Sequence, residues 1–253
     1  MVHIHGGGFS GGHKDKLRAS IIDQCRAAGI SLAAINYRLS QHAPFPAQMM
    51  DAARAIQFLR FHAGRWNLDP SRVGATGGSA GAGISLWLGY HDDLADASNS
   101  DPVLRQSTKL TCVGVINAQS SYDPRFILEH LRSPAKDHAW LLPFFGLKAE
   151  ELETARARRL FEEASLINFV SRHSPPTLLF YSFPNRPITP QTTPSEAIHH
   201  PIFGQLLQAK LAARGVECIL HYGEDVPGET KDDKIANHDP QLIAFFRRHL
   251  GAE

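Results

Sequence analysis

The stretch VGATGGSAGAG, residues 73–83, restricts the fold of this chain more than any other part of its sequence. The residues before Ser79 have the short apolar pattern of a strand, and those after it predict a helix. Residues 77–81 match G-x-S-x-G, in which small neighbours allow a sharp turn between strand and helix. Glycine and serine also cluster in ordinary loops, so this strand–turn–helix context carries the prediction. The stretch therefore predicts that Ser79 lies at the carboxyl end of a strand and at a helix N-terminus, where free N–H groups favour negative charge.

The rest of the chain alternates between strand and helix patterns. Such alternation is typical of a parallel sheet built from βαβ units. We expect an α/β fold with a mostly parallel sheet of about six strands flanked by helices. We also expect a single domain over residues 1–253, with a small helical cap inserted at about residues 124–164. The strands are expected within residues 2–5, 30–39, 72–78, 110–121, 175–183 and 216–223. The last helix is expected at residues 239–250, capped by Asp239 with Pro240 at its first position.

Composition excludes several classes of protein. Apolar residues make up 43% of the 253 residues, which is enough for a large core. The net charge of +1 gives no reason to expect a nucleic-acid partner, and no apolar run is long enough for a membrane span. The three cysteines are widely spaced and favour reduced thiols over a disulfide framework or a zinc site. A signal-peptide pattern is not visible, so a cytoplasmic location is expected unless an N-terminal signal has been lost.

A second glycine-rich loop, His5-Gly6-Gly7-Gly8, follows the first expected strand. Glycines leave backbone N–H groups unobstructed, and such groups can stabilise the oxyanion of a tetrahedral intermediate. A simple glycine turn and a phosphate-binding loop are the alternatives. A dinucleotide fingerprint, however, needs G-x-G-x-x-G and an acidic residue about twenty positions further on. This loop is denser in glycine and has a histidine before it, which favours the oxyanion interpretation.

Four stretches occur in the order and spacing found in hormone-sensitive-lipase-like esterases, a group of α/β-hydrolases. They are HIHGGGF, INYRLSQHAPFPAQMMDA, RVGATGGSAGAGISL and EEASLINFVSRHSPPTLL. The chain resembles this family from residue 1 to about residue 183. The resemblance implies that Ser79 is the nucleophile and that the N–H groups of Gly7, Gly8 and Ala80 form the oxyanion hole. It also implies a small ester as substrate, with no metal or organic cofactor.

Members of that family usually have two more strands and a cap segment before the H-G-G-G strand. This chain lacks them, which we interpret as a natural short form or a truncated sequence. Without these strands, residues 30–37 are expected to form an exposed sheet edge. Such an edge can pair with a second copy of the chain, so a homodimer is one expectation.

The rest of the catalytic triad departs from the family pattern. A serine hydroxyl needs a base, and the base needs an orienting group. The family has an aspartate about four residues beyond the position of Tyr181, where this chain has Asn185. The loop expected to supply the base, at about residues 223–239, contains one histidine, His238. Its neighbours differ from those of the family, so His238 is predicted as the base, with a solvated loop histidine as the alternative.

Other side chains remain candidates for the site. Asp123 ends the preceding strand and is an alternative acid, although an aspartate before proline is also common in turns. Asp225 is a weaker candidate on the same loop as His238. His199 and His200 resemble a metal-binding pair, but no third ligand has a fitting spacing.

Two functions follow from these residues. The first is a serine carboxylic-ester hydrolase that acts on small or short-chain acyl esters through an acyl-enzyme. It is expected to be slow if Asn185 holds the acid position, because an Asp-to-Asn change in a serine protease triad lowers turnover by about 10⁴. The alternative is an inactive relative that keeps the fold and binds a small molecule or a protein partner.

Overall fold

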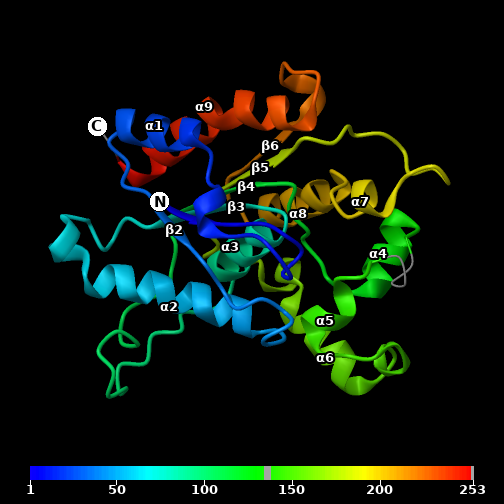
Figure 1. Cartoon of the computed structure of the whole chain (residues 1–253), viewed down its shortest axis with the longest axis horizontal. Coiled ribbons are helices and arrows are strands. Elements are labelled where there is room, and N and C mark those ends of the chain that lie inside the picture. The colour runs from blue at the N-terminus through cyan, green and yellow to red at the C-terminus, as the bar shows by residue number, and fades with distance from the viewer. Residues whose placement is uncertain (134–137, 252–253) are drawn as a thin grey trace.

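A computed structural model describes residues 1–133 and 138–251 of the chain. In this part of the chain a six-stranded sheet has the order β2-β1-β3-β4-β5-β6, and every pair of neighbours is parallel (Figure 1). The expected α/β class and the six parallel strands are confirmed. The strands are β1 (Val2–Ile4), β2 (Ala33–Ile35), β3 (Gly74–Gly78), β4 (Cys112–Ile116), β5 (Thr177–Tyr181) and β6 (Cys218–Tyr222).

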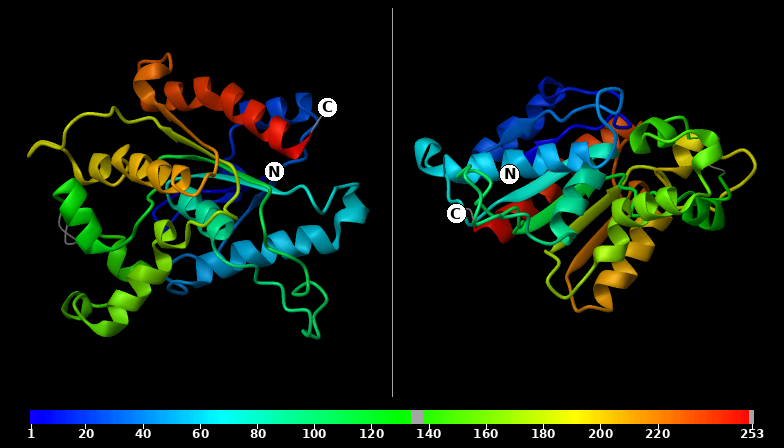
Figure 2. Two further views of the ribbon diagram at one scale, coloured as in Figure 1. Left: turned by 180° about the vertical axis from the view of Figure 1, so that it is seen from behind. Right: turned by 90° about the horizontal axis from the view of Figure 1, so that it is seen from below.

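Helices cover both faces of the sheet (Figures 1 and 2). Helices α1 and α9 pack together on one face, and α2, α3 and α8 cover the other. Strand β4 is buried along its whole length, as expected for a central parallel strand covered on both sides. The α-helices are α1 (Ala19–Ala27), α2 (Ala47–Phe61), α3 (Ala80–Tyr90), α4 (Pro124–Leu131), α5 (Leu141–Phe145), α6 (Ala155–Ala164), α7 (Pro194–Ala197), α8 (Ile202–Ala212) and α9 (Lys231–Leu250).

The segment expected as a cap contains α4, α5 and α6, which lie together at one end of the molecule (Figure 1). The ring of Phe144 in α5 stacks on Phe9 of the glycine-rich loop, with 3.9 Å between ring centroids. Phe145 makes an edge contact with Phe161 of α6. These aromatic contacts attach the helical segment to the loop that follows β1.

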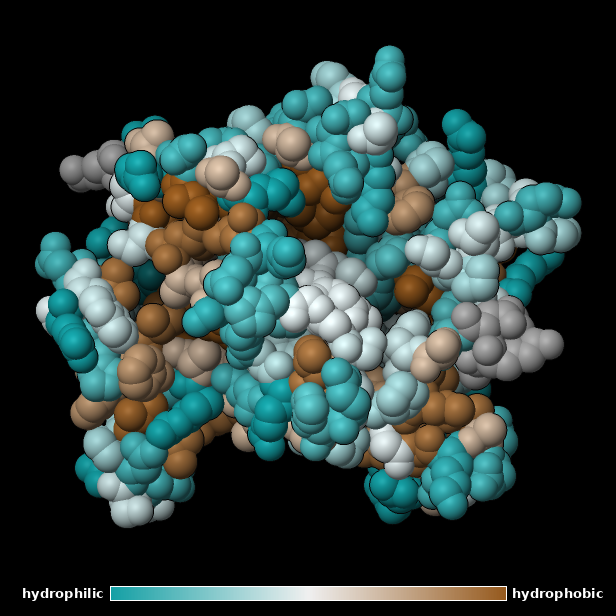
Figure 3. All heavy atoms as spheres, viewed as in Figure 1, coloured by the Kyte–Doolittle hydropathy of each residue, from teal (hydrophilic) through white to brown (hydrophobic). Residues whose placement is uncertain are grey.

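The edge of the sheet at β2 is flanked by hydrophobic surface. Figure 3 shows this surface between α1 and α2, beside β2. Four large hydrophobic side chains on α2 and the turn after it are more than a third exposed: Met50, Phe58, Phe61 and Trp66. Nothing in the structure identifies a partner for this edge, so the homodimer stays a prediction. None of the helices within the described residues is long and apolar enough to cross a membrane.

The final helix begins earlier than the sequence pattern indicated. Helix α9 starts at Lys231, because the hydroxyl of Thr230 accepts the N–H of Asp233 and the Asp233 carboxylate accepts the N–H of Thr230. The predicted start at Asp239 is therefore wrong, and Pro240 lies inside the helix. Asp239 is fully buried, and its carboxylate pairs with Arg18 rather than capping a helix.

Candidate active site

Ser79 occupies the turn between β3 and α3. Its backbone has φ 51° and ψ −117°, a strained conformation for a residue other than glycine. The Ser79 N–H donates to the carbonyl oxygen of Ile116 at 2.9 Å, which ties the turn to the carboxyl end of β4. The predicted strand–turn–helix unit is thus present, with α3 beginning at Ala80.

Two glycines allow this turn to form. A Cβ atom on Gly77 would lie 2.5 Å from the carbonyl oxygen of Ile4, and one on Gly81 would lie 2.0 Å from the same oxygen. Both distances are far shorter than any real Cβ contact, so strand β1, strand β3 and helix α3 can approach only with glycine at these positions. The G-x-S-x-G pattern is therefore a steric requirement of the turn as well as a sequence signature.

The glycine-rich loop lies directly beside Ser79. A Cβ atom on Gly6 would be 3.7 Å from the Cβ atom of Ser79. Gly7 and Gly8 have φ values of 120° and 58°, which glycine adopts readily. Within residues 1–133 and 138–251, the backbone N–H groups of Gly7, Gly8 and Ala80 have no hydrogen-bond acceptor. Free N–H groups in a loop beside a serine turn are one of the components needed to bind an oxyanion.

The histidine that contacts Ser79 is His199, in the turn after α7. Its Nε2 atom lies 2.9 Å from the hydroxyl oxygen of Ser79. Its Nδ1 atom lies 2.7 Å from the carbonyl oxygen of Ser195. Because a carbonyl oxygen can only accept, Nδ1 of the neutral ring carries the proton and Nε2 is left to accept from the serine. This is the tautomer that a general base requires.

The surroundings of His199 keep its ring neutral. Burial lowers its pKa from 6.5 to about 4, opposed by the hydrogen bond to Ser195 and assisted by the positive charge of Lys231. The ring of Phe183 stacks on it with planes 4° apart and centroids separated by 5.5 Å. His199 is therefore unprotonated, and able to accept a proton, throughout the neutral pH range.

The prediction for His238 needs correction. Because α9 starts at Lys231, His238 lies two turns inside the helix rather than in a loop, and it is fully buried. Its Nε2 atom is 2.9 Å from Nδ1 of His221 on β6, and its ring stacks on Phe180 of β5. The structure thus joins His238 to His221, and the hydrogen bond to Ser79 belongs to His199.

The buried His238 ring should make stability depend on pH. Burial, with a smaller contribution from His221, lowers the pKa of His238 from 6.5 to about 3. The unfolded chain takes up a proton near pH 6.5 and the folded protein does not, so the free energy of unfolding falls as the pH drops from about 6.5 toward 3. One pKa unit corresponds to about 1.4 kcal/mol, so His238 alone should lower the free energy of unfolding by about 2 kcal/mol between pH 7 and pH 5.

Replacing His238 with phenylalanine should make this loss of stability smaller. Phenylalanine keeps the stack on Phe180 and has no proton to gain. Denaturant unfolding at pH 7 and pH 5 should show a smaller decrease for His238→Phe than for the unaltered protein. An equal decrease in both proteins would contradict the neutral buried state of His238.

Asn185 does not orient a histidine in this structure. Its side chain is exposed, and its backbone N–H donates to the Glu224 carboxylate at 3.2 Å. Residues 184–187, which follow β5, are exposed, and the histidine that contacts Ser79 is held at Nδ1 by the Ser195 carbonyl oxygen rather than by Asn185. The sequence comparison that placed Asn185 beside the base is not supported by this geometry. Asp225, the weaker acid candidate, is exposed in the turn after β6.

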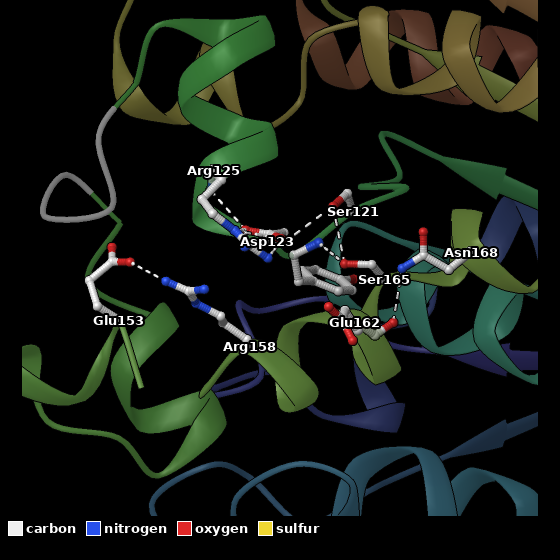
Figure 4. Close-up of polar contacts among 9 residues, drawn as sticks. Ser121, Asp123, Arg125, Glu153, Arg158, Glu162, Ser165 and Asn168 are labelled. Atoms are coloured by element: carbon white, nitrogen blue, oxygen red, sulfur yellow. Dashed lines mark hydrogen bonds and ion pairs between the residues drawn. The ribbon is translucent and has the colours of Figure 1, made fainter. Parts of the chain in front are cut away.

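Asp123 serves as the N-cap of α4. Its carboxylate accepts the backbone N–H of Arg125 at 2.9 Å and forms an ion pair with the Arg125 guanidinium at 2.6 Å (Figure 4). Pro124 at the first helical position fixes the start of the helix, which directs Asp123 to the cap. The alternative assignment of Asp123 as the triad acid therefore lacks a contact in the structure.

The adjacent histidine, His200, does not form a metal site with His199. Its Nε2 atom contacts the carbonyl oxygen of Arg186 at 2.7 Å, and its Nδ1 accepts the N–H of Ile202. Among the residues that the structure describes, no group of three or more histidine, cysteine or acidic side chains is arranged to bind a metal. The structure gives no support to His199 and His200 as a metal-binding pair. The contact of His199 with Ser79 was not predicted from the sequence.

The sheet, the strained serine turn and the adjacent glycine-rich loop define the α/β-hydrolase fold. A family model described as BD-FAE matches residues 1–194, so the chain belongs to the BD-FAE family, and the predicted resemblance to α/β-hydrolase esterases is confirmed.

Curated relatives of the chain are named as esterases. "Esterase LipQ" of Mycobacterium tuberculosis is 25% identical over 184 residues, which cover 72% of this chain and 40% of the relative. An "Acetyl esterase" of Salmonella paratyphi A is 26% identical over 194 residues, which cover 75% of this chain and 52% of the relative. The chain thus spans about half or less of the length of these relatives.

Solved structures share the fold. A truncated carbohydrate esterase from gut microbiota has a TM-score of 0.76 at 22% identity, covering 99% of this chain and 85% of its own. An acetyl ester-xyloside bifunctional hydrolase from Caldicellulosiruptor lactoaceticus has a TM-score of 0.72 at 24% identity, covering 99% of this chain and 83% of its own. At these identities the likeness concerns the fold alone.

Proposed function

We propose that this protein is a serine carboxylic-ester hydrolase in which Ser79 is the nucleophile and His199 is the general base. The observation that carries the proposal is the 2.9 Å contact between the Ser79 hydroxyl and Nε2 of His199. The free N–H groups beside Ser79 and the esterase names of the relatives agree with it.

The proposed reaction proceeds through an acyl-enzyme. The Ser79 oxygen attacks the ester carbonyl while its proton moves to Nε2 of His199. The N–H groups of Gly7, Gly8 and Ala80 stabilise the negative charge that develops on the carbonyl oxygen. His199 then donates the proton to the departing alcohol, and a water molecule activated by the same ring releases the acid.

The orienting group in this proposal is the Ser195 carbonyl oxygen, which replaces the usual carboxylate. A carbonyl dipole fixes the ring tautomer as a carboxylate does, but it stabilises the imidazolium of the transition state less than a full negative charge. We therefore expect a kcat below the enzyme median of about 10 s⁻¹. The low kcat is thus expected because the Ser195 carbonyl oxygen orients the base, and not because Asn185 occupies the acid position.

Small or short-chain acyl esters are the proposed substrates. Aromatic rings pack beside the glycine-rich loop: Phe9 stacks on Phe144, and Tyr122 meets Phe9 edge-on. The Cβ atom of Trp140 lies 3.8 Å from where a Cβ on Gly8 would be. A short acyl group is proposed because bulky rings pack beside the glycine-rich loop and because the Salmonella relative is named an acetyl esterase. Hydrolysis rates for p-nitrophenyl acetate, butyrate and octanoate test this, with the octanoate expected to be slowest.

The pH dependence of kcat/KM should report the low pKa of His199. Since the free enzyme acts through the neutral ring, kcat/KM should rise with pH, reach half its maximum near pH 4 and remain constant through neutrality. Initial rates taken within the folded lifetime of the protein at each pH give this profile. Lys231→Met should move the midpoint to higher pH, because the Lys231 charge lowers the pKa of His199. A midpoint near the ordinary histidine value of about 6.5 would contradict the buried state of the base.

A further inference from the structure

The four residues after β4 hold both ends of the segment that carries His199. This segment, residues 182–201, connects β5 to α8 and is mostly exposed between residues 184 and 196. At its start, the Asn117 side-chain oxygen accepts the N–H of Ser182 at 2.9 Å. Just beyond its end, the Ser120 hydroxyl donates to the carbonyl oxygen of Phe203 at 2.9 Å.

Gln119 makes the contact closest to the proposed base. Its side-chain amide donates to the carbonyl oxygen of Ile198 at 2.7 Å and to that of Asn117 at 3.1 Å. Ile198 directly precedes His199 in the chain. Gln119 is only 4% exposed, so water cannot readily replace its hydrogen bonds. One buried amide thus connects the end of β4 to the backbone beside His199.

The segment needs such an anchor because its own structure is slight. Helix α7 has only four residues, Pro194–Ala197, and a helix of this length has little stability by itself. The stacking ring, Phe183, belongs to the same segment and is only half-buried. The distance between His199 and Ser79 therefore depends on contacts made with the sheet.

We propose that Gln119 is a positioning residue that holds the His199 ring within hydrogen-bond distance of Ser79. This inference rests on the proposed function, in which His199 is the base. In this proposal Gln119 does not contact the substrate. It acts through the backbone of Ile198, and a displacement of about 1 Å of a catalytic group can cost about 10²-fold in rate.

Gln119→Leu removes the amide and keeps a similar side-chain volume. We expect kcat for p-nitrophenyl acetate to fall about 10- to 100-fold, with KM nearly unchanged. The same substitution in a His199→Ala background should have no further effect on kcat, because the ring that Gln119 positions is absent. The matched control is Gln57→Leu, which removes another buried glutamine whose amide donates to the carbonyl oxygens of Leu104 and Gln106. It should lower the melting temperature and leave kcat unchanged.

The outcomes separate this inference from the proposed function. If His199→Ala reduces kcat but Gln119→Leu does not, the positioning role is wrong and the base assignment stands. If Gln119→Leu lowers kcat equally in both backgrounds, Gln119 acts on the fold in general, and the positioning role is again wrong. If His199→Ala is as active as the unaltered protein, the base assignment is wrong, and the positioning role falls with it.

Discussion

Replacement of Ser79 by alanine is expected to remove ester hydrolysis, lowering kcat by at least about 10⁴-fold, since loss of the nucleophile in a serine hydrolase costs up to about 10⁶. Alanine at position 79 must adopt the same strained backbone as serine, so the substitution adds no new strain and the fold should persist. Ser85→Ala in helix α3, which begins directly after Ser79, is a matched control, because the buried Ser85 hydroxyl donates to the Gly81 carbonyl oxygen and has no role in the proposed reaction. Steady-state hydrolysis of p-nitrophenyl acetate by the three proteins provides the comparison.

Full activity in Ser79→Ala would show that hydrolysis does not use this serine. Equal losses in Ser79→Ala and Ser85→Ala, accompanied by equal falls in melting temperature, would show that helix α3 had been disrupted. The first result would contradict a nucleophile at the turn, and the second would attribute the loss of activity to the fold instead of the missing hydroxyl.

The second large effect is expected at His199. His199→Ala removes the base and should lower kcat by about 10³-fold or more, because general base catalysis typically supplies 10²–10⁴-fold. His200→Ala changes the adjacent ring, whose contacts are to the Arg186 carbonyl oxygen and the Ile202 N–H, and should retain most of the activity.

His238→Phe distinguishes the position suggested by the sequence from the one seen in the structure. The His238 ring is hydrogen-bonded to His221 and not to Ser79. This variant should therefore keep kcat within about threefold of the unaltered protein at pH 7, a difference in activation free energy below about 1 kcal/mol. A loss of kcat in His238→Phe, with His199→Ala fully active, would show that His238 is the base and would contradict the assignment of His199.

The serine turn could be predicted because local chemistry determines it. Gly77 and Gly81 lie within two residues of Ser79, and the strand and helix patterns lie on either side of the motif, so the whole signal is contained in one short stretch. The contact with Ile4 of β1 that makes both glycines necessary is seen only in the structure. The glycines of the oxyanion loop are similarly local to β1. The parallel sheet followed from the alternation of strand and helix patterns along the chain, which each element shows independently of the others.

The base could not be predicted in the same way. His199 is 120 residues from Ser79 in sequence, and no local pattern reveals the Gln119–Ile198 contact that we propose to position it. Placing His238 in a loop depended on taking Pro240 as the first residue of a helix. The capping box at Thr230 and Asp233 is the local signal that gives the actual start of α9, but it has aspartate where glutamate is usual. The acid position at Asn185 was expected from the family resemblance, whereas here Asn185 is exposed and its backbone N–H donates to the Glu224 carboxylate.

The central claim is that Ser79 is a nucleophile activated by His199, and the rate of phosphonylation of Ser79 tests it most directly. A serine-directed phosphonate is added at pH 7, and the labelled peptide is identified and timed by mass spectrometry. We predict that the label is found on Ser79, that its rate falls about 10²-fold or more in His199→Ala, and that the rate is unchanged in His238→Phe. Absence of label on Ser79, or an equal labelling rate in the unaltered protein and His199→Ala, would contradict the claim.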